Sequence, residues 1–178
     1  MDRGVDFLKS QVANAVMQHD TLLQSLIDHE KQAEDPRFRE LCSKHIPAMR
    51  EHQRMLEDYA RQLGAEQGMA KKALGKAMGV AKDLADAARE SDFLRLVSDI
   101  VMARQSEDTF KTFREAGRTL GNQQLAQIGE HGEKGHDDFV RDGNRLVQQM
   151  FVEHVRGTTA ADVAATTGTR AGDSRPGI

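Results

Sequence analysis

Glutamate and histidine residues occur in this sequence at positions where the apolar face of a helix is expected. Glu107 lies within one long helical pattern, and Glu133 and His136 lie one turn apart within the next. An uncompensated buried charge costs on the order of several kcal/mol, so inward carboxylates predict a partner that binds them. Helix bundles use inward Glu and Glu-x-x-His residues on facing helices to hold metal ions. These three residues therefore predict a metal site between two helices.

Two earlier helical patterns add candidate ligands on their own inner faces. Counting about 1.5 Å per residue from the turn between these patterns places His19 and His52 at one level near the middle of the bundle. The same count places Glu30 and His45 nearer its end. The predicted metal ligands are Glu107, Glu133, His136, His52, His19, Glu30 and His45. Mixed carboxylate and imidazole ligands suit iron, manganese or zinc.

Each candidate ligand also has an interpretation without a metal. A histidine on an apolar helix face is often a hydrogen-bonded core residue, and Glu30 lies in a last helical turn, where a half-exposed Glu is ordinary. Glu107 and Glu133 have cationic residues at helical spacing or across the bundle, so ion pairs are the alternative for both. The neighbouring cations are Arg104, Lys111, Arg114 and Lys134.

Long amphipathic helices must position these side chains. Apolar residues recur at spacings of three and four along four stretches, which are residues 5–33, 37–63, 93–120 and 123–155. Asp35-Pro36 predicts a helix stop followed by a capped restart, and Gly121-Asn122 predicts a turn. Because short connections make antiparallel neighbours, the predicted fold is an all-α four-helix bundle of two hairpins.

Two other segments differ from these helices in composition. Residues 64–90 carry repeated glycines among Ala, Lys and Met, which predicts a short extra helix in the connection between the hairpins. Residues 157–178 are rich in Gly, Thr and Ala and have almost nothing to bury, which predicts a disordered tail. The predicted organisation is one helical bundle over residues 1–156 followed by this tail.

Glycines also recur every three residues beside the Glu-x-x-His motif, at Gly129, Gly132 and Gly135. Each costs a helix about 1 kcal/mol relative to alanine. The repeat therefore indicates close approach of another helix or room for a ligand, and the alternative is chance or a locally irregular helix.

Composition limits the classes of partner. The formal net charge is −3 and no basic stripe is evident, so no nucleic-acid partner is expected. No apolar run approaches the roughly 18 residues of a membrane span, and no secretory signal is visible. The single cysteine, Cys42, permits no internal disulfide and is typical of a reducing compartment. We expect a cytoplasmic protein that forms a homodimer, the commonest oligomer.

These features resemble the ferritin-like superfamily, above all its small bacterial stress-associated members of the YciE/YciF type. The resemblance covers residues 5–155 and includes the two hairpins, the Arg61-Gln62-Leu63-Gly64 end of the second helix and the Ala/Met/Lys-rich connection after it. In metal-binding members, the first and third helices each give a Glu, and the second and fourth each give Glu-x-x-His. The resemblance therefore implies an iron or manganese site and a role in stress.

One half of that ligand pattern is matched here. Glu107, Glu133 and His136 stand at the third- and fourth-helix positions, whereas Met49 stands where a Glu would precede His52. A full set of ligands for two ions is therefore missing.

The first-helix ligand has two alternatives. His19 occupies the position of the expected carboxylate, or else His45 is the second-helix ligand, with Cys42 at the Glu position and Glu30 as its first-helix partner. The resemblance thus implies a degenerate site for one or two ions. The alternative is a metal-free oligomeric scaffold or interaction protein that has lost the site.

Overall fold

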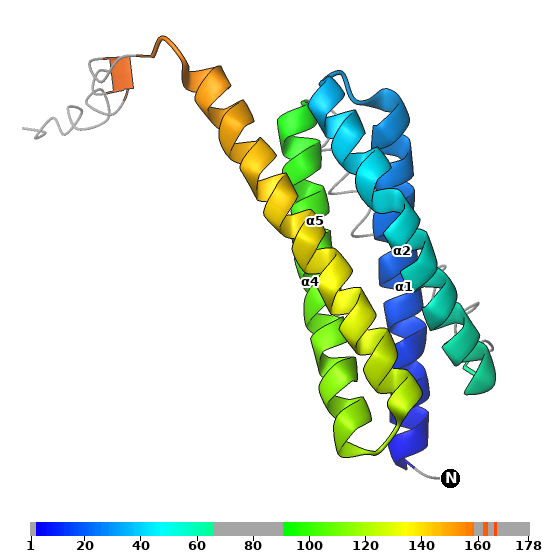
Figure 1. Ribbon diagram of the computed structural model, residues 1–178. Coiled ribbons are helices and arrows are strands. Elements are labelled where there is room, and N and C mark those ends of the chain that lie inside the picture. Colours follow the sequence, from blue (N-terminus) through cyan, green and yellow to red (C-terminus); the bar gives the residue numbers. More distant parts are fainter. Residues whose placement is uncertain (1–2, 66–90, 159–161, 164–165, 167–178) are drawn as a thin grey trace, which may run out of the picture.

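A computed structural model describes residues 3–65, 91–158, 162–163 and 166, and four long helices make up most of this part of the chain. The helices are α1 (Arg3–Gln32), α2 (Pro36–Gln62), α4 (Asp92–Thr119) and α5 (Gln123–Val155), and the described residues contain no strand (Figure 1). The all-α fold class and the four predicted helical stretches are confirmed. The extra helix predicted within 64–90 and the predicted tail lie largely outside the described residues.

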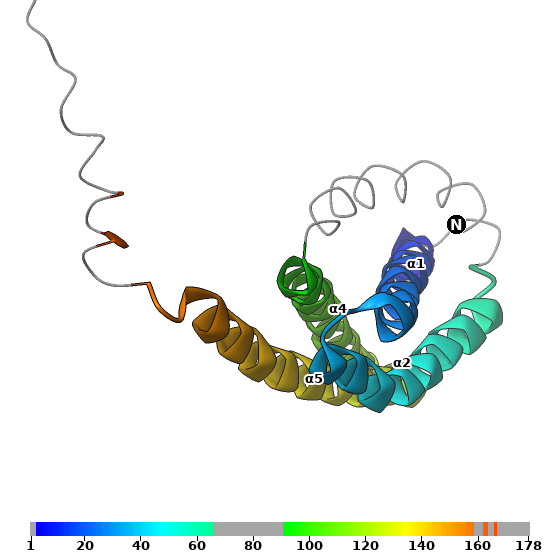
Figure 2. The ribbon, with the colours of Figure 1, turned by 90° about the horizontal axis from the view of Figure 1, so that it is seen from above.

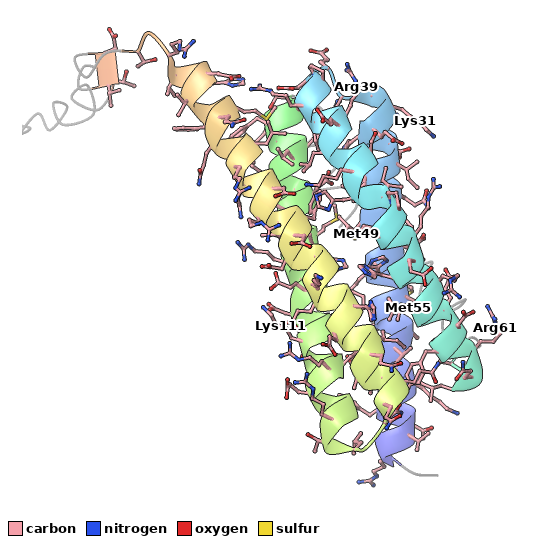
Figure 3. The ribbon with its side chains drawn as sticks, viewed as in Figure 1. Lys31, Arg39, Met49, Met55, Arg61 and Lys111 are labelled. Carbon is pink, nitrogen blue, oxygen red and sulfur yellow. The ribbon has the colours of Figure 1, made fainter. Side chains whose placement is uncertain are left out.

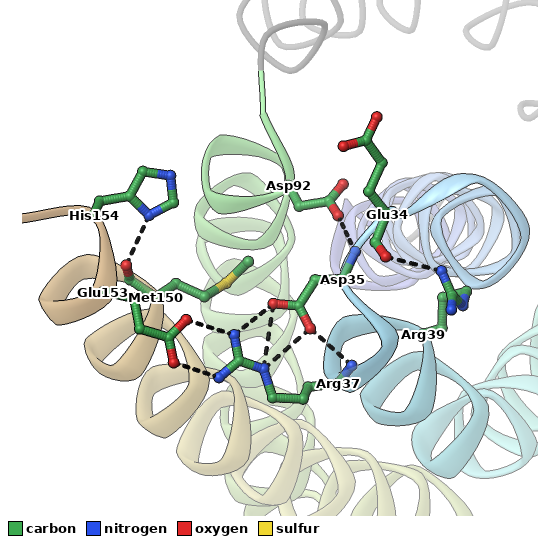
Figure 4. Close-up of polar contacts among 8 residues, drawn as sticks. All are labelled: Glu34, Asp35, Arg37, Arg39, Asp92, Met150, Glu153 and His154. Atoms are coloured by element: carbon green, nitrogen blue, oxygen red, sulfur yellow. Dashed lines mark hydrogen bonds and ion pairs between the residues drawn. The ribbon is translucent and has the colours of Figure 1, made fainter.

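Polar side chains cap the helices where each hairpin turns. The carboxylate of Asp35 accepts a hydrogen bond of 2.8 Å from the backbone N–H of Arg37 at the start of α2. Figure 4 shows the same carboxylate binding the Arg37 guanidinium, which also donates two bonds of 2.8 Å to Glu153 in α5. Asn122 caps α5 by accepting a bond of 3.0 Å from the N–H of Leu125. Local sequence therefore determines where these helices begin.

The helices form a ring in which α1 contacts α2 and α4, and α5 contacts α2 and α4. The α4–α5 pairing is the most extensive, since glycines let the two backbones approach closely. A Cβ at Gly129 would lie 2.2 Å from the backbone nitrogen of Arg114 in α4, and one at Gly117 would lie 2.3 Å from that of Ala126 in α5. Seen from above, the last turns of α5 lean away from the other three helices (Figure 2).

Two apolar clusters make up the core of the bundle. The cluster toward the α1–α2 turn includes Leu22, Leu26, Phe38, Met49, Leu96 and Phe139. The cluster toward the α4–α5 turn includes Val12, Val16, Leu56, Phe110, Leu125 and Ile128. Along α1, α2 and α5, a buried histidine separates the residues of one cluster from those of the other. The polar layer at mid-bundle thus divides the apolar core.

Charged side chains cover the outside of the bundle. Lys31 and Arg61 point away from the helices in Figure 3, whereas the buried Met49 lies among them. Ion pairs at helical spacing, such as Arg54 with Glu51 and Asp58, run along this surface. In the part of the chain that the structure describes, no helix is both long and apolar enough to cross a membrane.

A candidate metal centre of three histidines

Three of the predicted ligands meet in the middle of the bundle. His19 of α1, His52 of α2 and His136 of α5 each offer a ring nitrogen within 4.8 Å of the other two. Their ring centroids are 5.1 to 6.0 Å apart, and the three residues are only 0 to 6% exposed. We call this group the three-histidine cluster. It draws its members from both hairpins, so a ligand bound there would join them.

Each ring of the three-histidine cluster has one buried nitrogen without a hydrogen-bond partner among the described residues. These atoms are Nε2 of His19, Nδ1 of His52 and Nε2 of His136. The Nδ1 atom of His19 lies 2.9 Å from Oε1 of Gln53, and that of His136 lies 2.7 Å from the carbonyl oxygen of Gly132. Because these oxygens can only accept, both Nδ1 atoms carry the proton and both Nε2 atoms present a lone pair.

Burial also keeps the three rings neutral. Desolvation lowers the pKa of His19 and of His52 from 6.5 to about 4, and the pKa of His136 to about 3. The proximity of the other histidines lowers the pKa of His52 and His136 further, while the bond to Gln53 raises that of His19. Neutral imidazole is the form that binds metals, so near pH 7 no proton has to leave a charged ring.

Phe110 and two glycines shape the space around the rings. The Phe110 ring lies 5.0 to 6.0 Å from all three histidine rings. A Cβ at Gly132 would lie 2.2 Å from the Phe110 ring, and one at Gly135 would lie 2.3 Å from Cε1 of His52. Gly132 therefore leaves room for Phe110 and Gly135 for His52, whereas Gly129 permits close approach of α4.

The predicted carboxylates do not belong to the three-histidine cluster. Glu107 is buried, and its carboxylate accepts a bond of 2.5 Å from Nζ of Lys111. Glu133 is ion-paired with Arg114 of α4. Each carboxylate thus has a cationic partner. This is the alternative that the sequence also allowed, in which both residues form ion pairs.

Glu30 and His45 have partners of their own as well. The carboxylate of Glu30 accepts a bond of 2.6 Å from the hydroxyl of Ser43. The Nε2 atom of His45 lies 3.2 Å from Oδ2 of Asp142. Neither residue belongs to the group of side chains that could hold an ion together.

Sequence reasoning missed Gln53, which supports the cluster. Gln53 is 7% exposed, and its side-chain nitrogen donates a bond of 2.7 Å to Glu57 while its oxygen accepts from His19. Met49 lies four residues before it and Leu56 three residues after it, so the apolar period already placed Gln53 on the inner face of α2. A glutamine on the apolar face of a predicted helix was therefore the sequence signal for a buried polar contact.

Asp99 is a second buried polar residue that the sequence analysis missed. It is 0% exposed, and its two oxygens accept bonds of 2.7 Å from Ser25 and from Nδ1 of His29. Asp99 lies three residues after Leu96 and four before Ala103, which again places it on an inner helix face. We call Asp99, Ser25 and His29 the aspartate cluster.

Comparisons of this chain with protein-family models, with curated proteins and with solved structures give no match. What the site can do chemically follows from its own geometry. Three neutral imidazoles on three helices offer nitrogen ligands, which suit zinc, copper, nickel and iron. Nitrogen atoms bound tetrahedrally at about 2.1 Å from one ion lie about 3.4 Å apart. The three ligand atoms lie within 4.8 Å of one another, so the rings would move closer together around one ion.

Proposed function

We propose that this protein binds a single transition-metal ion through His19, His52 and His136. The observation that carries the proposal is the unpartnered buried nitrogen on each of the three rings. Leaving a buried donor or acceptor unpaired costs about 1 to 3 kcal/mol, and an ion that draws on all three rings offsets that cost. Three histidines are also the protein ligands of one class of zinc site, in which the fourth position remains open to water or another ligand.

The donor set also bears on which ion is bound. Imidazole suits zinc, copper, nickel and iron, whereas manganese prefers oxygen ligands. Because no carboxylate belongs to the group of described residues that could hold an ion, we propose zinc or copper ahead of the iron and manganese expected from sequence. Both also stand above iron in the general order of affinity for nitrogen sites.

The ferritin-like resemblance supports the architecture of this proposal but not its ligands. A carboxylate-rich site for two ions does not fit the residues present, because Glu107 and Glu133 are already paired with Lys111 and Arg114. We propose a ferritin-like bundle in which an imidazole site for one ion stands in place of that site. The stress-associated role, the cytoplasmic location and the homodimer stay predictions.

Metal analysis of wild-type protein and two matched variants tests the proposal. The protein is stripped with a chelator, loaded with Zn²⁺ or Co²⁺, desalted and assayed for metal per chain. We expect one equivalent in wild type and in His131→Ala, which alters an exposed histidine of the same helix, and none in His136→Ala. The proposal would be refuted if wild type retained no metal, or if wild type and His136→Ala retained the same amount of metal per chain.

The metal-free scaffold predicted as the alternative gives the opposite result in that experiment. It retains no ion in any variant, and its unfolding temperature does not respond to Zn²⁺. A bound ion, in contrast, stabilises the folded chain by about 2.7 kcal/mol at a free concentration one hundred times its Kd. The thermal shift therefore separates the two functions without any assumption about activity.

A further inference from the structure

We infer that Gln53 and Glu57 fix the proton of His19 on Nδ1 and thereby prepare Nε2 as a ligand, an inference that rests on the proposed metal site. The three side chains form a chain of hydrogen bonds between α1 and α2. His19 donates from Nδ1 to Oε1 of Gln53 at 2.9 Å, and Gln53 donates from Nε2 to Oε1 of Glu57 at 2.7 Å. We call this chain the Gln53 relay.

The outer end of the Gln53 relay determines its direction. Glu57 is exposed, and an ionised carboxylate offers only acceptors. The amide of Gln53 must therefore turn its NH₂ group toward Glu57, which leaves its oxygen facing His19. An amide oxygen can only accept, so the proton of the neutral ring lies on Nδ1 and the lone pair on Nε2.

The other two rings are not held in this way. His136 donates to the backbone carbonyl of Gly132, four residues earlier in the same helix, so its proton position needs no second helix. The Nδ1 atom of His52 has no partner within the described residues. Among the three rings, His19 alone thus has its proton position set by a side chain from another helix. Gln53 is accordingly a positioning residue rather than a ligand.

Such partners matter to metal sites in general. A histidine ligand commonly donates its second N–H to a carbonyl or carboxylate, and mutation of that partner costs about 10- to 100-fold in metal affinity. Here the carboxylate of Glu57 ends the relay, so its negative charge is coupled through Gln53 to the ring that would carry part of the ion's positive charge. The direction of the hydrogen bonds leaves a lone pair on Nε2 of His19, and the charge of Glu57 is negative. Both favour a cation at this nitrogen.

Zn²⁺ affinity of the full-length protein, measured by competition with a chromogenic chelator, tests the relay. Gln53→Leu removes the acceptor at similar volume, and we expect the Kd for Zn²⁺ to rise 10- to 100-fold, as for other partners of metal ligands. The exchange Gln53→Glu with Glu57→Gln keeps an acceptor facing His19 and a donor behind it. We therefore expect its Kd to rise by no more than about threefold over that of wild type. Gln18→Leu, at an exposed glutamine beside His19, is the control and should leave the Kd unchanged.

Nitrogen-15 NMR of the metal-free protein tests the proton position independently. We expect His19 to carry its proton on Nδ1 in wild type and in the exchanged pair, and to lose that preference in Gln53→Leu. A proton on Nε2 in wild type, or an unchanged Kd in Gln53→Leu, overturns the inference. A wild type that binds no Zn²⁺ but shows the expected proton pattern overturns the proposed function and supports the relay.

Discussion

Two polar clusters lie between the helices of this bundle, and they differ in whether their buried polar atoms have hydrogen-bond partners. In the aspartate cluster, Ser25 and His29 each bond one oxygen of Asp99 at 2.7 Å. In the three-histidine cluster, every ring has a nitrogen without a partner among the described residues. The first cluster joins α1 to α4, and the second joins α1, α2 and α5.

The difference shows how a buried polar group can serve structure or function. A satisfied network is stabilised by its own contacts, and removal of one member leaves the others unpaired. An unsatisfied set costs free energy of folding unless something binds to it, and removal of a member removes part of that cost. We therefore expect substitutions in the two clusters to change the free energy of unfolding in opposite directions.

Acid should affect the three-histidine cluster most strongly. The pKa values of His19, His52 and His136 fall to about 4, 4 and 3 in the folded protein, so the unfolded chain binds more protons between pH 6.5 and pH 4. The free energy of unfolding is thus unaffected by this titration above pH 6.5 and declines as the pH falls toward 4. Since one pKa unit corresponds to about 1.4 kcal/mol, we expect the free energy of unfolding to fall by several kcal/mol between pH 6.5 and pH 5.

Urea unfolding of the metal-free protein at pH 7.5, 6 and 5 measures this loss. The decline should become shallower in His136→Leu, which removes one of the three titrating rings. A free energy of unfolding that stays level from pH 7.5 to pH 5 would show that the rings are not held neutral by burial.

Removal of the Asp99 carboxylate should have the next largest effect. Asp99→Ala leaves Ser25 and His29 without their acceptor and opens a cavity in the core. We expect the free energy of unfolding at pH 7.5 to fall by about 3 kcal/mol, as when one partner of a buried pair is removed. Asp108→Ala, at an exposed position of the same helix, is the control and should change it by less than about 0.5 kcal/mol. Equal effects of the two substitutions would mean that the aspartate cluster contributes nothing specific.

Replacement of His136 should act in the opposite direction. In metal-free protein at pH 7.5, His136→Leu removes an unpartnered buried nitrogen and fills similar volume with apolar atoms. We expect the free energy of unfolding to rise by about 1 kcal/mol, while stabilisation by Zn²⁺ disappears. His131→Leu, at an exposed site, should show neither change. Destabilisation by several kcal/mol would instead place His136 in a satisfied network, and the contrast between the clusters would fail.

Substitution of Glu107 should have the smallest effect. Its partner Lys111 has a side chain that is 43% exposed, and such half-solvated pairs contribute about 0 to 1 kcal/mol. We expect Glu107→Gln to lower the free energy of unfolding by less than about 1 kcal/mol. We expect the same substitution to leave the Kd for Zn²⁺ within about twofold of wild type. A tenfold weaker Kd would make this carboxylate a ligand, as the sequence predicted.

The fold could be predicted from sequence because its signals are local. The apolar period and the caps at Asp35 and Asn122 depend on neighbouring residues, and the helix ends differ from the predicted ones by no more than two residues. Counting along the helices also placed His19 and His52 at one level, and their rings lie 6.0 Å apart. Rise per residue is a property of every helix, so this part of the site needed no tertiary information.

The partners of the inward carboxylates could not be predicted in the same way. Lys111 and Arg114 are long and flexible side chains. Helical spacing shows that Lys111 can reach Glu107 but not that it does, and the contact of Arg114 with Glu133 crosses from α4 to α5. Gln53 was missed for a related reason, because its contact with His19 depends on how α1 and α2 are rotated against each other. The apolar period shows which face of a helix a residue lies on. The hydrogen bonds and ion pairs between two helices depend on how those helices pack.

The glycines of α5 have a consequence for how chains built on the same plan could be found. A side chain at 129 would strike the backbone of α4, and one at 135 would strike the ring of His52. With Gly132 and His136 they form the string Gly-x-x-Gly-x-x-Gly-His, which follows His19 of α1 and His52 of α2 in the chain. Because larger residues at 129 and 135 would clash, that string can serve as a sequence pattern for identifying distant relatives after the surface residues have diverged.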